Sequence, residues 1–211
     1  MFGFLRTKSD ITDETAMECY QNGDIKCFEL LLARYNQRIF RFVLCMVYGD
    51  KTVAEDLLQE VFIKVIENKN SFDCAKNFNT WLYGLTRNHV IDYFRKEYFR
   101  RHSSLDRIAG NSDSKVTMLD QVRSEYRDQE ELIQDKQKRD KLYEKLDEIR
   151  DEYREVFVLR EFDGLKFDEI ADITDTNLNT VKSRHRYAFR ELREKLMETG
   201  YFGDLKDSGE R

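Results

Sequence analysis

The chain has 211 residues, of which 40% are hydrophobic and 36% charged, with no proline and nine glycines. This composition excludes a membrane-spanning protein, because no apolar segment approaches the length of a bilayer crossing, and it predicts an all-α fold, because little interrupts helices. The net charge of −5 argues against a basic protein that scans DNA freely, although positive charge gathers near Arg95–Arg101 and Lys182–Arg193. Such a chain would bind DNA weakly alone and would need a partner to hold it there.

Three helices are predicted at the amino-terminal end. A short helix over 11–23 ends at Gly23, and Asp24 is placed to cap the next helix. The second helix continues to about Tyr48, before a break at Gly49–Asp50, with an apolar stripe formed by Phe28, Leu31, Tyr35, Ile39, Phe42 and Met46. The third helix, 54–68, has a polar face of Asp56, Gln59, Glu60 and Lys64. That face alone indicates no function, because most amphipathic helices have a solvated side.

The cysteines have no CxxC spacing; they are Cys19, Cys27, Cys45 and Cys74. Because no secretory leader is expected, they are predicted to be reduced thiols of a cytoplasmic protein. A zinc site built from them is not expected, and neither a metal nor a cofactor is predicted.

A helix over 77–101 is the first candidate for binding chemistry. Residues at steps of three or four on one face are Trp81, Leu85, Asn88, Asp92 and Arg95, and a basic cluster of Arg95, Lys96, Arg100 and Arg101 follows. The adjoining face, Leu82, Leu85, His89 and Tyr93, is predicted to be buried. An aromatic ring beside an amide and cations suits unstacked bases and their phosphates. The alternative is an ordinary amphipathic helix with Trp81 in the core and a solvated basic end.

The loop before this helix, 68–78, is polar but contains Phe72, an aromatic residue that a solvated turn does not need. After the helix, residues 102–129 are polar without a stable period, which predicts a flexible linker. A tail over 198–211 is predicted to be frayed.

A second helical domain is predicted beyond the linker. Its apolar stripe begins with Leu132, Leu142, Leu146 and Ile149, and its first long helix ends at Gly164. A short helix near 167–173, a polar turn over 174–180 and a helix from Thr180 then follow the helix-turn-helix pattern. The exposed face of the last helix offers Lys182, Ser183, Arg186 and Tyr187. A generic amphipathic helix pair is the alternative.

Three segments in order resemble the conserved domain of bacterial sigma factors of the extracytoplasmic-function (ECF) group. They are FELLLARY (28–35), AEDLLQEVFIKV (54–65) and NTWLYGLTRNHVIDYFRK (79–96). The resemblance implies a sigma region 2 domain at 11–101 that binds the clamp helices of core RNA polymerase through Asp56, Gln59 and Glu60. It also implies that this domain melts and reads the minus-ten promoter element through Phe72, Trp81, Asn88, Asp92, Arg95 and Lys96. Asn88 and the loop, Phe72 in particular, would hold a flipped base.

Residues 140–196 resemble the carboxy-terminal domain of the same sigma factors. This implies a region 4 domain at 130–197 that reads the minus-thirty-five element in the major groove, with contacts from Thr180, Lys182, Ser183, Arg184, Arg186 and Tyr187. The family commonly has glycine in the turn where this chain has Asp175 and Asn179, two residue types that tolerate a left-handed backbone. Relatives also often place arginines at the positions of Tyr187 and Phe189. His185 is predicted to be packed or partly exposed rather than a metal ligand.

The expected function is that of a sigma factor: a non-enzymatic, cytoplasmic protein that binds core RNA polymerase and promoter DNA and is controlled by an anti-sigma factor, without membrane insertion. The sequence has no phosphate-binding glycine loop, HExxH or GxSxG motif. The alternatives are a stand-alone helix-turn-helix regulator and a helical adaptor that binds only protein. A stand-alone regulator should shift duplex DNA by itself, whereas a sigma factor should need core polymerase.

Overall fold

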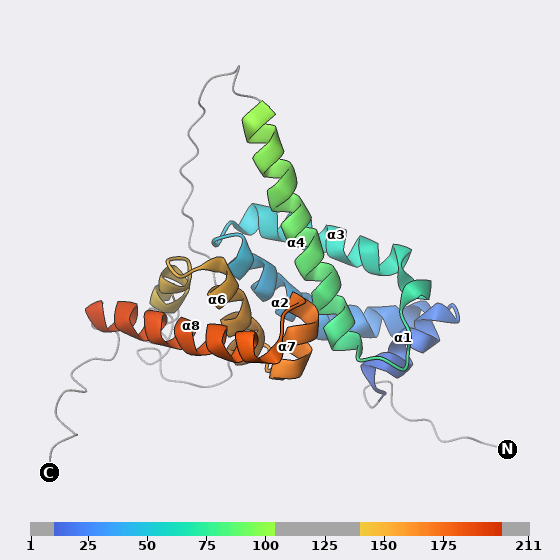
Figure 1. Cartoon of the computed structure of the whole chain (residues 1–211). Coiled ribbons are helices and arrows are strands. Elements are labelled where there is room, and N and C mark those ends of the chain that lie inside the picture. The colour runs from blue at the N-terminus through green and yellow to red at the C-terminus, as the bar shows by residue number, and fades with distance from the viewer. Residues whose placement is uncertain (1–10, 104–139, 200–211) are drawn as a thin grey trace, which may run out of the picture.

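The computed structural model describes residues 11–103 and 140–199, and every regular element in these ranges is a helix (Figure 1). The predicted all-α fold with two helical domains is thereby confirmed. Residues 104–129 of the predicted linker and 200–211 of the predicted tail lie outside the described ranges.

The first helices begin at polar caps. Thr12 caps α1 (Asp13–Gln21) by accepting the Thr15 N–H, and Asp24 caps α2 (Ile25–Met46) by accepting the Lys26 N–H, as predicted for Asp24. Gly23 between these helices has a φ of 101°, a left-handed conformation that favours glycine. Asp50 caps α3 (Lys51–Glu67), so this helix begins one turn before the predicted residue 54.

A loop with one 3₁₀ turn (Lys69–Ser71) connects α3 to the long helix α4 (Phe78–Ser103). Asn77 starts α4, because its Oδ1 accepts the Thr80 N–H at 3.0 Å. The amino-terminal half of α4 packs on α2 and α3, whereas its far end extends beyond them with Phe99 exposed (Figure 1).

The second domain contains a helical segment over 140–146, α6 (Asp151–Phe157) with a π-helical turn (Val158–Phe162), α7 (Phe167–Thr174) and α8 (Leu178–Glu198). The α7–α8 pair confirms the predicted helix-turn-helix. Asp175 in its turn is left-handed, with φ 51° and ψ 46°, whereas Asn179 lies in the first turn of α8. Asn177 caps α8 by accepting the Thr180 N–H, so this helix begins at Leu178 rather than at Thr180.

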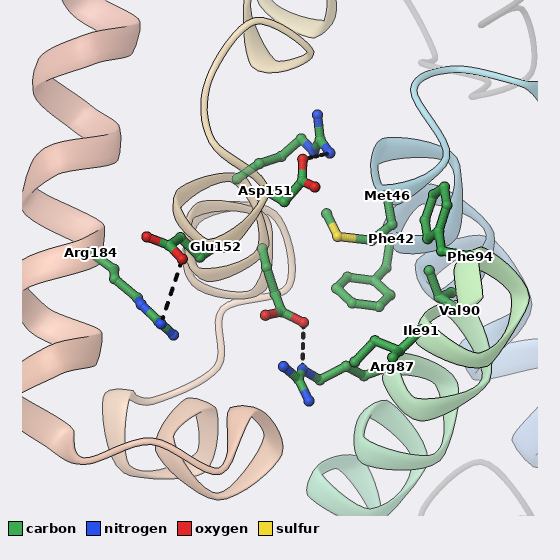
Figure 2. Close-up of a pocket in the computed structure, with 11 residues that line it drawn as sticks. Phe42, Met46, Arg87, Val90, Ile91, Phe94, Asp151, Glu152 and Arg184 are labelled. Carbon is green, nitrogen blue, oxygen red and sulfur yellow. Dashed lines mark hydrogen bonds and ion pairs between the residues drawn. The ribbon is translucent and has the colours of Figure 1, made fainter. Parts of the chain in front are cut away.

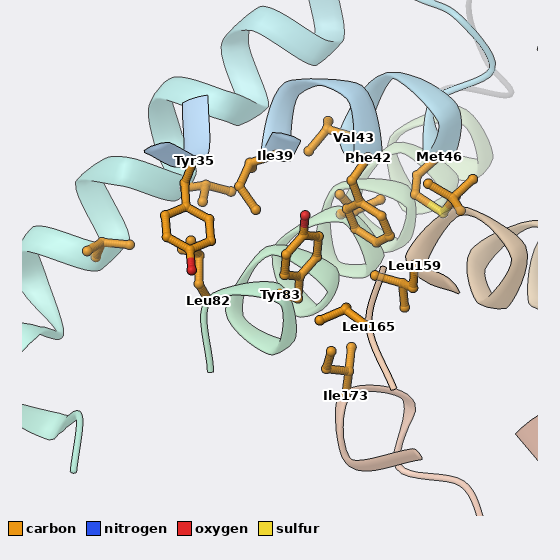
Figure 3. Close-up of a cluster of buried hydrophobic side chains, with 14 of the residues drawn as sticks. Tyr35, Ile39, Phe42, Val43, Met46, Leu82, Tyr83, Leu159, Leu165 and Ile173 are labelled. Carbon is orange, nitrogen blue, oxygen red and sulfur yellow. The ribbon is translucent and has the colours of Figure 1, made fainter. Parts of the chain in front are cut away.

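A continuous hydrophobic core joins the two domains (Figure 3). From the first domain it includes Ile39, Phe42 and Tyr83, and from the second Leu159, Leu165 and Ile173, each of them buried. α7 packs directly against α4. A smaller cluster within the helix-turn-helix domain is formed by Leu146, Ile149, Phe157, Ala188, Leu192 and Leu196.

Ion pairs and hydrogen bonds also cross between the domains. Arg41 Nη2 donates to Asp163 Oδ1 and to the Phe162 carbonyl, both at 2.7 Å, and Arg38 donates to the Asp163 carbonyl at 3.1 Å. The Asp163 side chain is 0% exposed; burial raises its pKa, and the Arg41 guanidinium opposes that shift. Arg87 Nε lies 2.7 Å from a carboxylate oxygen of the buried Glu155. We call this packing of the second domain on the first the closed arrangement.

Candidate nucleic-acid and polymerase interfaces

A pocket of about 470 Å³ lies on the face of α4 that was predicted to bind DNA. Trp81, Asn88 and Asp92 all line it, so the structure brings together three of the predicted minus-ten residues. Asn88 and Asp92 are exposed and Trp81 is half-buried. An aromatic ring, an amide and a carboxylate thus share one recess, and such groups bind an unpaired base by stacking and hydrogen bonding. We call this recess the α4 pocket.

Basic side chains continue from the α4 pocket along the helix. Arg95 and Lys96 are exposed one turn beyond Asp92, outside the pocket lining. Arg95 lies 3.4 Å from the Asp92 carboxylate, an exposed contact that costs little to break. Both cations are therefore available to the backbone phosphates next to a base bound in the pocket.

Phe72, which was predicted to help hold a flipped base, has a buried ring. It is 4% exposed, and its ring packs against Phe78 and Trp81 at centroid distances of 5.5 and 5.1 Å. In this arrangement the ring contacts its aromatic neighbours rather than solvent, so Phe72 supports the loop from its buried side. Its role in holding a base stays a prediction, and the sequence did not indicate that the loop packs its aromatic ring onto α4.

The α4 pocket has further walls, of which the sequence predicted the loop but not α7. Asn68 and Ser71 of the loop line one side, and Asp172 and Ile173 of α7 line another. The loop residues belong to the segment 68–78, which was predicted to help hold a flipped base. The α7 residues belong to the other domain, and the sequence contained no signal for that contact.

The predicted polymerase-binding face lies on α3. Asp56, Gln59 and Glu60 are all exposed on α3, on the side opposite its buried Leu57 and Val61. Glu60 Oε2 also lies 2.7 Å from Nε2 of His89, a buried histidine on α4 whose pKa is lowered by burial. The acidic face is therefore connected to the α4 pocket, which His89 also lines.

The structure divides the residues predicted to read the minus-thirty-five element. Lys182, Arg186 and Tyr187 are exposed on α8, as a recognition helix requires. Ser183 is half-buried and donates through Oγ to the Asn179 carbonyl, a bond within the helix. Thr180 lies half-buried in the first turn of α8.

Arg184 points away from the exposed face of α8. Its Nη2 lies 3.8 Å from Glu152 on α6, beside a cavity of about 310 Å³ between the two domains (Figure 2). His185 is half-buried, 2.8 Å from Glu161 through Nε2, which agrees with the prediction of a packed or partly exposed side chain. In the closed arrangement the half-buried Arg184 side chain thus lines the cavity between the domains.

The cysteines differ from the prediction of four reduced thiols. Cys19 in α1 and Cys27 in α2 form a disulfide, while Cys45 is a buried thiol and Cys74 a half-buried one. Sequence spacing gave no signal for this pair, because the turn between the two helices brings them together. Asp24 places its carboxylate near the same pair, within 4.8 Å, but sulfur atoms joined in a disulfide are not thiolate ligands for a metal.

Comparison with known proteins gives a consistent result. Residues 31–100 match sigma-70 region 2, and residues 139–192 match sigma-70 region 4. The chain is 33% identical to the ECF RNA polymerase sigma-E factor of Escherichia coli K12 over 176 residues, which are 82% of this chain and 88% of that protein. It is 30% identical to the ECF RNA polymerase sigma factor SigW of Bacillus subtilis 168 over 178 residues, or 84% and 93% of the two chains.

Solved structures share the fold. The sigma factor RpoE in complex with the anti-sigma factor NepR from Bartonella quintana aligns with a TM-score of 0.64 and 22% identity, over 82% of this chain and 98% of that one. CnrH in complex with the cytosolic domain of CnrY aligns with a TM-score of 0.58 and 21% identity, over 88% and 97%. No helix in the described part of the chain is long and apolar enough to cross a bilayer. Matches to both sigma regions and to relatives along most of their length show that the chain belongs to the ECF sigma factors, which direct promoter-specific initiation by RNA polymerase without being catalysts themselves.

Proposed function

We propose that residues 11–101 bind core polymerase and open the minus-ten element, and that residues 130–197 read the minus-thirty-five element. The observation that carries this division is the α4 pocket, which gathers Trp81, Asn88 and Asp92 on one face of α4, whereas Asp56 and Gln59 are exposed on α3 outside its lining. The exposed side chains of α8 support a second DNA surface, apart from the α4 pocket. Three interfaces on three different helices allow one protein to hold polymerase and two promoter elements together.

The α4 pocket has the chemistry needed to stabilise an open duplex. Extruding a base costs a few kcal/mol of stacking and pairing. Asn88 can form hydrogen bonds with a base edge, and the half-buried Trp81 offers a ring at the pocket wall. Arg95 and Lys96 would hold the neighbouring phosphates, adding affinity without reading sequence. Asp92 is placed to influence which base is accepted.

The closed arrangement limits when DNA can enter. Asp172 and Ile173 of the second domain line the α4 pocket, and the carboxylate of Asp172 would repel a nucleic-acid backbone. DNA entry therefore requires the domains to separate, a step that core polymerase would drive by binding each domain at its own site. This accounts for the expected weak DNA binding of the chain alone.

An anti-sigma factor is a further proposed partner, because two similar folds were solved as complexes of a sigma factor with such a protein or with the cytosolic domain of a partner. The proposed location is the cytoplasm, where RNA polymerase acts.

The decisive experiment is run-off transcription with purified core polymerase on a pool of genomic fragments. We expect promoter-dependent transcripts only when both the chain and core are present. An active core that produces none with this chain would refute the function. A stable shift of a specific duplex by the chain alone would instead support the stand-alone regulator.

A further inference from the structure

The last turn of α1 is bonded to the loop that borders the α4 pocket. Gln21 Nε2 lies 2.6 Å from the Lys69 carbonyl and 2.9 Å from the Phe72 carbonyl. One side-chain amide thus donates to both ends of the segment 69–72, from 48 and 51 residues away along the chain. Cys74 Sγ donates to Gln21 Oε1 at 3.3 Å, which fixes the orientation of the amide.

This turn of α1 is itself firmly held. Tyr20 is 6% exposed and stacks on Phe28 of α2 at 4.8 Å, and the Cys19–Cys27 disulfide joins the same two helices. Lys69 Nζ lies 4.8 Å above the Tyr20 ring. Gln21 therefore projects from a firmly packed part of α1. We take the position of the loop to depend on Gln21, and not the position of Gln21 to depend on the loop.

The held segment forms part of the pocket rim. Asn68 and Ser71 line the α4 pocket, whereas Gln21 does not. Within the loop, the Ser71 N–H and Oγ both donate to the Asn68 carbonyl, at 2.9 and 2.8 Å, so the segment moves as one unit. A shift of the Lys69 and Phe72 carbonyls would move Asn68 and Ser71 with them.

We propose that Gln21 is a positioning residue for the α4 pocket: its two amide donors hold segment 69–72 so that the rim is already formed when an unpaired promoter base arrives. The inference rests on the proposed minus-ten role of this pocket. Its ligand is an unstacked base of single-stranded DNA, and Gln21 acts on that base only through the loop. A preformed rim avoids the cost of ordering a loop during base capture.

The test is Gln21→Glu in reconstituted holoenzyme, because glutamate keeps the size of the side chain and removes both donors. We expect open-complex formation on an intact promoter to fall about fivefold to tenfold, the effect of one or two net hydrogen bonds. On a promoter already mismatched at the extruded base, the rate should recover in part. Discrimination among promoters that differ only at that base should also weaken. Gln37→Glu, the same substitution at an exposed position of α2, is the matched control and should behave as wild type.

Three comparisons separate positioning from simple destabilisation and from failure of the pocket itself. Affinity for core polymerase should be unchanged by Gln21→Glu. If the variant instead lost affinity for core and opened all promoters equally poorly, Gln21 would be only a structural residue and the proposal would be overturned. Asn88→Ala in the same assay tests the pocket: if it reduces opening and Gln21→Glu does not, only the positioning role fails. If neither has an effect, the minus-ten assignment of the pocket fails.

The double variant provides the most specific measure. Gln21→Glu combined with Asn88→Ala should cost less than the two single effects multiplied, because both act on one pocket. Fully multiplicative effects would contradict a shared site. Should Gln21→Glu unfold at the assay temperature, Gln21→Met removes the same donors without adding a charge, and the same outcomes apply.

Discussion

Asn88 is exposed inside the α4 pocket, where only an extruded base would meet its amide. Asn88→Ala should leave affinity for core polymerase and for closed duplex nearly unchanged, yet reduce open-complex formation, because the unstacking cost of a few kcal/mol is no longer offset. Permanganate reactivity of unpaired thymines, with wild-type and variant holoenzyme, measures this. Equal reactivity on an intact promoter would remove Asn88 from the base site.

Arg186 and Arg184 are separated by one residue but have different surroundings. Arg186 is exposed on α8, whereas Arg184 lies near Glu152. Arg186→Ala should therefore weaken holoenzyme binding to a promoter with its minus-thirty-five element by about 1–3 kcal/mol, the range of a good base contact. Arg193→Ala, also exposed but two turns further along α8, serves as the control. A loss of the same size on every DNA sequence would make Arg186 a phosphate contact.

At the scale of elements, α3 offers an acidic face to a partner. Reversing Asp56 to Lys should weaken core binding by about 2 kcal/mol or more if this face is an interface hot spot. Asp56 is the better position to change, since Glu60 contacts the buried His89 and its reversal would disturb the domain. Glu67→Lys, at the exposed end of the same helix, is the control. Competition for core polymerase against the wild-type chain gives the affinities, and unchanged affinity would exclude the Asp56 face.

The contact between α3 and α4 also predicts a pH dependence. Burial lowers the pKa of His89 below its usual value of 6.5, so the unfolded chain takes up a proton more readily than the folded one. The stability that His89 contributes is thus complete above about pH 6.5 and falls as the pH drops through the lower folded pKa. Urea unfolding at about pH 7.5 and about pH 5.5 should show this loss, and His89→Gln should lack that part of it. An identical pH dependence in both proteins would contradict it.

Local elements were predictable from the sequence because their signals are local. Asp24 as a helix cap and the α7–α8 pair follow from residue spacing, and both are present. The burial of Phe72 could not be predicted, because burial in a loop depends on distant partners such as Trp81. The hydrogen bonds of Gln21 likewise join segments far apart in sequence, and no period or motif indicates such contacts. The sequence therefore indicated the helix face and the loop of the site, but not the walls that the second domain contributes.

For the whole molecule, the closed arrangement depends on the contacts of Asp163 with α2. Arg41→Ala leaves the Asp163 carboxylate buried with less compensation, so the interdomain contact should weaken by about 2 kcal/mol or more. The domains can then separate, which returns Asp163 to water. Small-angle scattering of the full chain should show a larger radius of gyration. Arg34→Ala, which removes an ion pair to Asp13 within the first domain, should not expand the chain; equal expansion of both variants would place the closing contacts elsewhere.

Trp81 is the single tryptophan of the 211-residue chain, and it lies in the α4 pocket that Ile173 of the second domain also lines. Tryptophan emission from this protein consequently comes from one known place, next to the proposed base site and the closing helix. Separation of the domains exposes the indole to water, which shifts its emission to the red and opens it to soluble quenchers. A base stacked on the indole would instead quench the Trp81 emission. The unlabelled protein therefore carries its own fluorescent reporter. Separation of the domains and capture of a base can be timed separately in one stopped-flow trace.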